Sequence, residues 1–114
     1  MALRLAVVIQ EDPISSHRAV EALRIALGLA GTVQDLIVAL LNNAPLLLSK
    51  DPADVEDVEV LEQYKPAIQE LGLPFLVPKG TCTRFPLDSR FSVQEVSLEN
   101  LVALLCQYDR VITF

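Results

Sequence analysis

The chain has 114 residues, close to the commonest size of one domain and enough to bury a core without disulfide or metal support, which predicts a single domain over residues 1–114. The formal net charge of -6 and the isoelectric point near 4.6 argue against direct binding of nucleic acid, because contacts to phosphate need clustered lysine and arginine. Hydrophobic residues make up 52% of the chain, more than a monomer of this size needs, so we expect apolar surface to meet a partner subunit.

Cysteine and histidine are too scarce for a disulfide framework or a His/Cys metal site, since the chain has two cysteines and one histidine. No metal and no organic cofactor are expected. The most apolar region, residues 36–48, is broken by Asn42, Asn43 and Pro45, so no membrane span is predicted. Residues 1–4 run directly into a strand-like segment without the features of a secretory signal, so we expect a cytoplasmic protein with free thiols.

Two apolar runs in the first half of the chain predict buried strands. Residues 3–9 and 36–41 are apolar without strict alternation, which is typical of strands covered on both faces in a parallel sheet. Between them, the aspartate, proline and serines of residues 12–16 offer a helix start, and Gly31 offers its end. We expect the inward face of that helix to carry Val20, Leu23, Leu27 and Ala30.

Two further helical segments follow the second strand. Residues 46–48 are expected to form a short helix. Apolar residues at helical spacing then predict a longer helix over residues 55–71, which Pro66 should kink or divide in two, and which Gly72 ends. Its inward face is expected to carry Val58, Leu61, Ile68 and Leu71.

The last third of the chain predicts a strand, a long loop, a helix and a closing strand. Residues 74–77 form the strand, and the glycine and prolines of residues 78–90 indicate the loop. Ser97 caps the helix, with Glu99 favourably placed in its first turn, and residues 109–114 form the closing strand. The inward residues of this helix are expected to be Leu98, Leu101, Val102 and Leu105.

Strands separated by helices predict an α/β fold, with a parallel β-sheet covered by helices on both faces in flavodoxin-like layering. In such sheets the functional residues lie in loops beyond the carboxyl ends of the strands. Here those loops are residues 10–16, 42–45 and 78–90.

Cys82 is the first candidate for chemistry, because it lies in the third of these loops between Lys79 and Arg84. The two cations are expected to favour the thiolate over the thiol. An accessible thiolate can take the outer sulfur from a donor persulfide and pass it to an acceptor. We therefore predict Cys82 as the catalytic residue, with Lys79 and Arg84 supporting it. A free loop cysteine without function is the alternative.

The other candidate residues are weaker. Cys106 lies on the apolar side of the last helix, where cysteine usually packs as a small hydrophobic residue. His17 is more simply an exposed or capping residue than a general base. Glu11 and Asp12 follow the first strand, as in phosphorylated receiver domains, but no aspartate ends a later strand to accept the phosphate. The same acidic residues do not suit the phosphate loop of a flavodoxin.

Both ends of the chain carry a resemblance to a known family. The opening strand of residues 3–9, the alanine-rich stretch of residues 19–29 and the ending Asp109-Arg110-Val111-Ile112-Thr113-Phe114 are similar to the DsrE/DsrF-like sulfur-relay family, most closely to its TusD/DsrE-type subunits. The resemblance implies a parallel-sheet α/β fold and assembly into homomeric or heteromeric trimers or hexamers. It also implies persulfide transfer, between donor and acceptor proteins, through a cysteine after the third strand, which Cys82 matches by location.

Two alternatives to sulfur carriage stay open. The family cysteine is trailed by Arg-Gly, whereas Arg90 here precedes Phe91, so the chain could instead be a non-catalytic structural subunit. A small-molecule binding module on a flavodoxin-like fold is the second alternative, because a fold does not fix a function. In each case we expect the subunit interface around residues 40–48, where apolar residues are densest.

Overall fold

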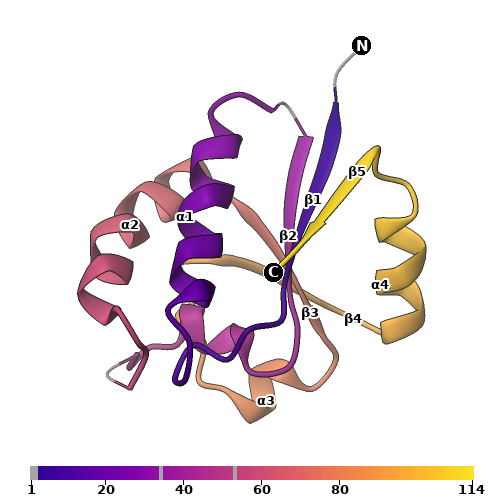
Figure 1. Ribbon diagram of the computed structural model, residues 1–114. Coiled ribbons are helices and arrows are strands. Elements are labelled where there is room, and N and C mark those ends of the chain that lie inside the picture. The colour runs from indigo at the N-terminus through magenta and orange to yellow at the C-terminus, as the bar shows by residue number, and fades with distance from the viewer. Residues whose placement is uncertain (1–2, 34, 53) are drawn as a thin grey trace.

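A five-stranded, fully parallel sheet organises the chain, as Figure 1 shows for the computed structural model, which describes residues 3–33, 35–52 and 54–114. The strand order is β4-β3-β2-β1-β5. The strands are β1 (Arg4–Ile9), β2 (Asp35–Leu40), β3 (Pro74–Pro78), β4 (Ser92–Val96) and β5 (Arg110–Thr113). The predicted α/β class with a parallel sheet is confirmed.

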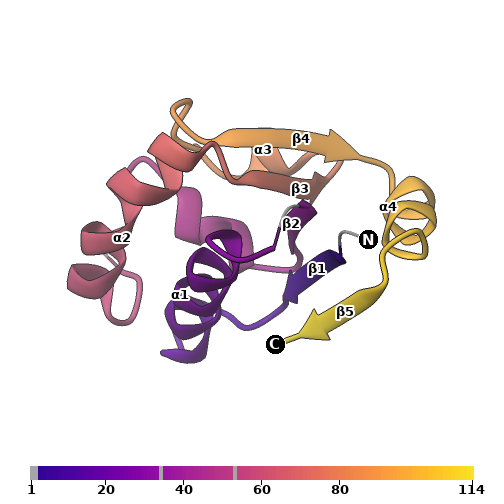
Figure 2. The same ribbon diagram turned by 90° about the horizontal axis from the view of Figure 1, so that it is seen from above.

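Helices cover the two faces of the sheet unequally (Figure 2). One face carries α1 (Arg18–Ala30), the 3₁₀ helix η1 (Ala44–Leu48) and α2 (Val58–Leu71), which enclose the larger hydrophobic core. Among the described residues, the other face carries only α4 (Leu98–Leu105), which packs on a small cluster around Val8, Ala39 and Leu76. Alternate residues of each central strand point to opposite faces, so both faces need apolar side chains.

The fourth strand, β4, was not predicted from the sequence. It lies at the edge of the sheet and pairs with β3 from Pro74↔Ser92 to Pro78↔Val96. Only its last residue, Val96, is buried, so the strand lacks the apolar run that marks the central strands. The prediction of a loop over residues 78–90 was also partly wrong, because this segment contains the short helix α3 (Thr81–Arg84).

Several predicted helix boundaries are confirmed. The Ser97 hydroxyl accepts a hydrogen bond from the Asn100 N–H at 3.2 Å and so caps α4, with Glu99 in the first turn. Gly72 ends α2 with a φ of 63°, a left-handed conformation that favours glycine. Pro66 does not divide α2 in two, because one helix runs from Val58 to Leu71 around it.

The start of α1 differs from the prediction, since the first turn begins only at Arg18. Residues 12–16 form a preceding turn, in which the Ser15 and Ser16 N–H groups donate to the Asp12 carbonyl. The Ser16 hydroxyl then accepts from the Arg18 N–H at 3.1 Å. Ser16 therefore binds the first N–H group of the helix, although the cap position itself is held by His17.

The Asp-Arg ending that carries the family resemblance joins β5 to β1. The Asp109 carboxylate accepts from the Arg4 N–H at 2.8 Å, and the Asp109 N–H donates to the Arg4 carbonyl at 2.8 Å. The Arg4 guanidinium also lies over the Tyr108 ring, 4.7 Å from its centroid. These contacts fix the register of the closing strand, so this part of the motif has a structural role.

The predicted positions of exposed and buried apolar residues were partly wrong. Residues 40–48 were expected at an interface, but Leu40, Leu47 and Leu48 are fully buried because η1 packs into the larger core. In α4, Leu101 is buried as predicted, whereas Leu98 and Val102 are 65% and 56% exposed. The short α4 turns one side to the sheet and leaves the other uncovered.

Within the described ranges, none of the helices combines the length and the apolar character that a membrane crossing requires.

Candidate functional site

The three loops predicted to lie together at the carboxyl edge of the sheet are joined by hydrogen bonds. The Asn43 amide donates to the Asp12 carboxylate at 3.3 Å, and the Arg84 guanidinium donates to the Asn43 side-chain oxygen at 2.9 Å. Asp12 follows β1, Asn43 follows β2 and Arg84 belongs to α3 after β3. The parallel sheet therefore brings the candidate loops together, as expected for this fold.

Cys82 lies on α3, where the chain turns sharply after β3 (Figure 1). Gly80 makes the turn with a φ of 91°, which a residue with a β-carbon rarely adopts. The buried Thr81 anchors the turn by donating its hydroxyl hydrogen to the Pro78 carbonyl at 2.6 Å. Cys82, the next residue, is exposed to solvent.

Cys82 is one of the residues that line a cavity of about 390 Å³ beside the edge strand β4. An irregular segment frames the cavity, since the Lys50 N–H donates to the Pro86 carbonyl and the Asp88 N–H to the Leu48 carbonyl, each at 2.8 Å. Phe91, one of the lining residues, packs edge-on against Phe75 of β3. The lining residues are Lys50, Cys82, Pro86, Leu87, Asp88, Ser89, Phe91 and Val93.

Glu95, on β4, is the charged group that acts on Cys82. Its carboxylate accepts a hydrogen bond from the Cys82 N–H at 2.8 Å. Partial burial raises the pKa of the Cys82 thiol, and hydrogen bonding to Glu95 and the charge of Glu95 raise it further. In turn, the hydrogen bond from the Cys82 N–H is the largest cause that lowers the pKa of Glu95. Near neutral pH, both shifts favour a protonated thiol beside an ionised carboxylate.

Lys79 and Arg84, which were predicted to support a Cys82 thiolate, have other partners in the structure. Arg84 donates to Asn43 instead and lies over the Phe85 ring, 4.6 Å from its centroid. The charge of Lys79 acts on Glu95, whose pKa it helps to lower. Proximity in the sequence suggested that two cations would lie beside Cys82. Instead, the pairing of β4 with β3 brings the Glu95 carboxylate, 13 residues away in the sequence, to the cysteine.

The remaining candidate residues lie apart from this cavity. Cys106 was predicted to pack as a small hydrophobic residue, but it is exposed at the end of α4. His17 is exposed at the cap position of α1, and its side chain makes no capping hydrogen bond. Across the described part of the chain, no cluster of three or more His, Cys, Asp or Glu side chains is arranged to hold a metal ion.

Asp88 adds an ion pair at the cavity wall. Its carboxylate accepts from the Arg90 backbone N–H at 3.0 Å and from the Arg90 guanidinium at 2.7 Å. These contacts lower the pKa of Asp88 from 3.8 to about 2, with the Arg90 side chain as the largest cause. Asp88 is thus paired with a cation, whereas Lys50 also lines the cavity and Glu95 is bound to the neighbouring Cys82 N–H.

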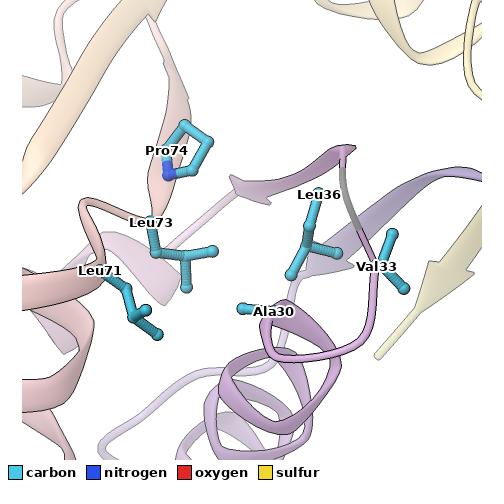
Figure 3. A pocket seen from close by; sticks show the side chains of 6 residues that line it. All are labelled: Ala30, Val33, Leu36, Leu71, Leu73 and Pro74. Atoms are coloured by element: carbon cyan, nitrogen blue, oxygen red, sulfur yellow. The ribbon is translucent and has the colours of Figure 1, made fainter. Parts of the chain in front are cut away.

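A smaller cavity of about 140 Å³ lies at the opposite, amino-terminal end of the strands (Figure 3). Its walls come from the ends of α1 and α2 and the starts of β2 and β3. Among the described residues, those that line this cavity include no nucleophile and no charged side chain. The lining residues are Ala30, Val33, Leu36, Leu71, Leu73 and Pro74.

The protein is thus an α/β protein with a parallel sheet and a cysteine-containing cavity at the carboxyl edge. Among solved structures, its fold is similar to that of the YchN protein of E. coli, with a TM-score of 0.73 over 98% of this chain and 99% of that chain. The two sequences are 22% identical, so the likeness shows the fold. A scan against protein-family models gave no match, and a search of curated proteins gave none either.

Proposed function

We infer that the protein carries persulfide sulfur on Cys82. The observation that carries this proposal is an exposed thiol on a short helix at the carboxyl edge, in a residue that lines a cavity with both apolar and charged residues. A cavity of this kind gives a reacting sulfur access to a partner while limiting its contact with water. The sequence resemblance to DsrE/DsrF-like proteins, together with the parallel α/β fold, supports the same activity.

The proposed transfer needs no cofactor. The Cys82 thiolate attacks the outer sulfur of a donor persulfide R–S–SH, the S–S bond of the donor breaks, and a new S–S bond forms at Cys82. The donor leaves as a thiolate and takes up the proton that Cys82 released. The outer sulfur moves between two thiols without net oxidation or reduction. An acceptor thiolate then removes the sulfur from Cys82 by the same step.

A non-catalytic structural subunit is the second candidate, and the environment of Cys82 favours it in one respect. Reactive cysteines usually have a lowered pKa, whereas burial and Glu95 raise the pKa of Cys82. In a structural subunit this thiol would not exchange sulfur, and a paralogous subunit would carry it.

Intact-mass measurement after incubation with a small-molecule persulfide donor separates the two candidates. Sulfur carriage predicts an adduct of about 32 Da, one sulfur atom, on the wild type. The adduct should disappear in Cys82→Ser and persist in Cys106→Ser, a matched control because both cysteines are free and exposed. A wild type that stays unmodified, or an adduct that depends on Cys106, would leave the structural subunit as the better account.

The proposed carrier also assembles with further copies of itself. Leu98 and Val102 on α4, and Val111 on the edge strand β5, are exposed apolar side chains. We refer to these three residues as the α4–β5 surface. The unpaired edge of β5 offers backbone groups for strand pairing, and a second copy presents the same apolar residues in a two-fold contact.

A further inference from the structure

Glu95 stands beside the reacting thiol, where it meets any sulfur donor that reaches Cys82. Its carboxylate accepts a hydrogen bond from the Cys82 N–H at 2.8 Å, and the same carboxylate helps to raise the pKa of the Cys82 thiol. Both residues are exposed, so solvent and partners reach them together. The charge next to the sulfur is therefore negative and accessible.

Other charged groups lie around this pair. Lys79, at the end of β3, acts on Glu95, and Arg84 of α3 binds Asn43. Across the cavity, Asp88 is paired with Arg90, and Lys50 lies at the wall. Among the described residues, Glu95 is the only charged group that shifts the pKa of Cys82.

We propose that Glu95 determines which partners exchange sulfur with Cys82, by selecting donors that carry a positive charge close to their reacting sulfur. Where the partner is a persulfide donor, this inference rests on the proposed function. The selection of donors by their charge applies to any exchange reaction at the Cys82 sulfur.

The physical basis is neutralisation of the carboxylate on docking. A cation beside Glu95 cancels the charge that disfavours the thiolate, so Cys82 loses its proton more easily when such a donor is bound. An anionic donor is repelled and leaves the thiol protonated. The same contact therefore keeps the thiol unreactive at rest and promotes exchange with a cationic donor.

Three small disulfides that differ in charge test the inference in a Cys106→Ser background: cystamine (cationic), bis(2-hydroxyethyl) disulfide (neutral) and 3,3′-dithiodipropionate (anionic). In each exchange the Cys82 thiolate displaces one thiolate, which takes up the released proton, and a mixed disulfide remains on the protein for intact-mass detection. Rates are divided by those of the Cys82→Ser protein, whose Cys106 corrects for the intrinsic reactivity of each reagent.

We expect the corrected rates to fall in the order cationic, neutral, anionic. In Glu95→Gln the cationic-to-neutral ratio should drop by about fivefold, the scale of one interaction between unit charges at about 4 Å in water. Glu95→Asp keeps the charge and should keep the order. Glu70→Gln, at an exposed position near the far end of α2, removes the same charge away from the site and should leave the ratio unchanged.

Equal corrected rates for the three reagents in the wild type, or an unchanged cationic-to-neutral ratio in Glu95→Gln, would overturn the inference. Failure of the proposed function is a separate result, because it appears as a missing 32 Da persulfide adduct, about one sulfur atom, on a protein that still ranks the three disulfides. If Glu95→Gln does not fold, high salt replaces it: screening should compress the wild-type ranking if Glu95 causes it.

Discussion

Leu101 attaches α4 to the sheet, so truncating it should be costly. Of the eight residues of α4, all within the described ranges, only Leu101 is buried, at 1% exposure, against the cluster of Val8, Ala39, Leu76 and Val96. A buried Leu→Ala change costs about 2–5 kcal/mol, from lost transfer energy and from the cavity that remains. Taking about 3 kcal/mol at roughly 4 °C per kcal/mol, the melting temperature of Leu101→Ala should fall by roughly 12 °C.

Leu98→Ala is the matched control, since the same side chain is removed from the same helix at a position that is 65% exposed. Its cost should stay below about 0.5 kcal/mol. Urea unfolding of both variants, followed by circular dichroism at low protein concentration, gives the two free energies. Equal losses would refute the view that one residue holds α4. A Leu98→Ala loss that grows with protein concentration would instead indicate that the exposed side is covered by another subunit.

Two further predictions concern pH and assembly. The folded-state pKa of Asp88 is lowered to about 2 from 3.8, so its ion pair with Arg90 stabilises the fold above pH 3.8 and loses this effect as the pH falls through about 2. At neutral pH, Asp88→Asn should therefore unfold at a lower urea concentration than the wild type. The difference between the two urea midpoints should disappear in acid, and a difference that does not change with pH would contradict this prediction. Sedimentation of the wild type should give a mass above 12.5 kDa, which Val102→Glu reduces, whereas a wild type at 12.5 kDa would refute self-association.

Strand patterns predicted the central part of the fold because buried parallel strands are apolar on both faces. β1 and β2 could be identified from such runs, and Gly72 and Ser97 mark helix ends through local backbone chemistry. The edge strand β4 could not be identified in this way, because an edge strand with one buried residue needs no apolar run. Its polar sequence is compatible with a loop.

The position of the site was predicted from the sequence, but the charge of the group next to Cys82 was not. The location of Cys82 follows from the rule that loops at the carboxyl edge carry function. The hydrogen bonds that Arg84 donates to Asn43 and that Asn43 donates to Asp12 show that these loops lie together. The contact between Cys82 and Glu95 depends on strand pairing, which neighbouring residues in the sequence do not reveal.

The exposure of apolar residues on α4 also depends on tertiary structure, so it could not be predicted from the sequence. The spacing of Leu98, Leu101, Val102 and Leu105 shows that the helix has an apolar side, but it does not show how much sheet is available to cover that side. In this fold one short helix faces one small cluster, and only Leu101 reaches it fully.

The central claim, that sulfur resides on Cys82, is tested most directly by peptide mapping of the persulfide-treated wild type after alkylation. Cleavage after lysine and arginine places Cys82 in the peptide of residues 80–84 and Cys106 in that of residues 91–110, so one digest compares both exposed cysteines. We predict the additional sulfur, about 32 Da, in the 80–84 peptide and its absence from the other. Equal labelling of the two peptides, or labelling of residues 91–110 alone, would contradict the account.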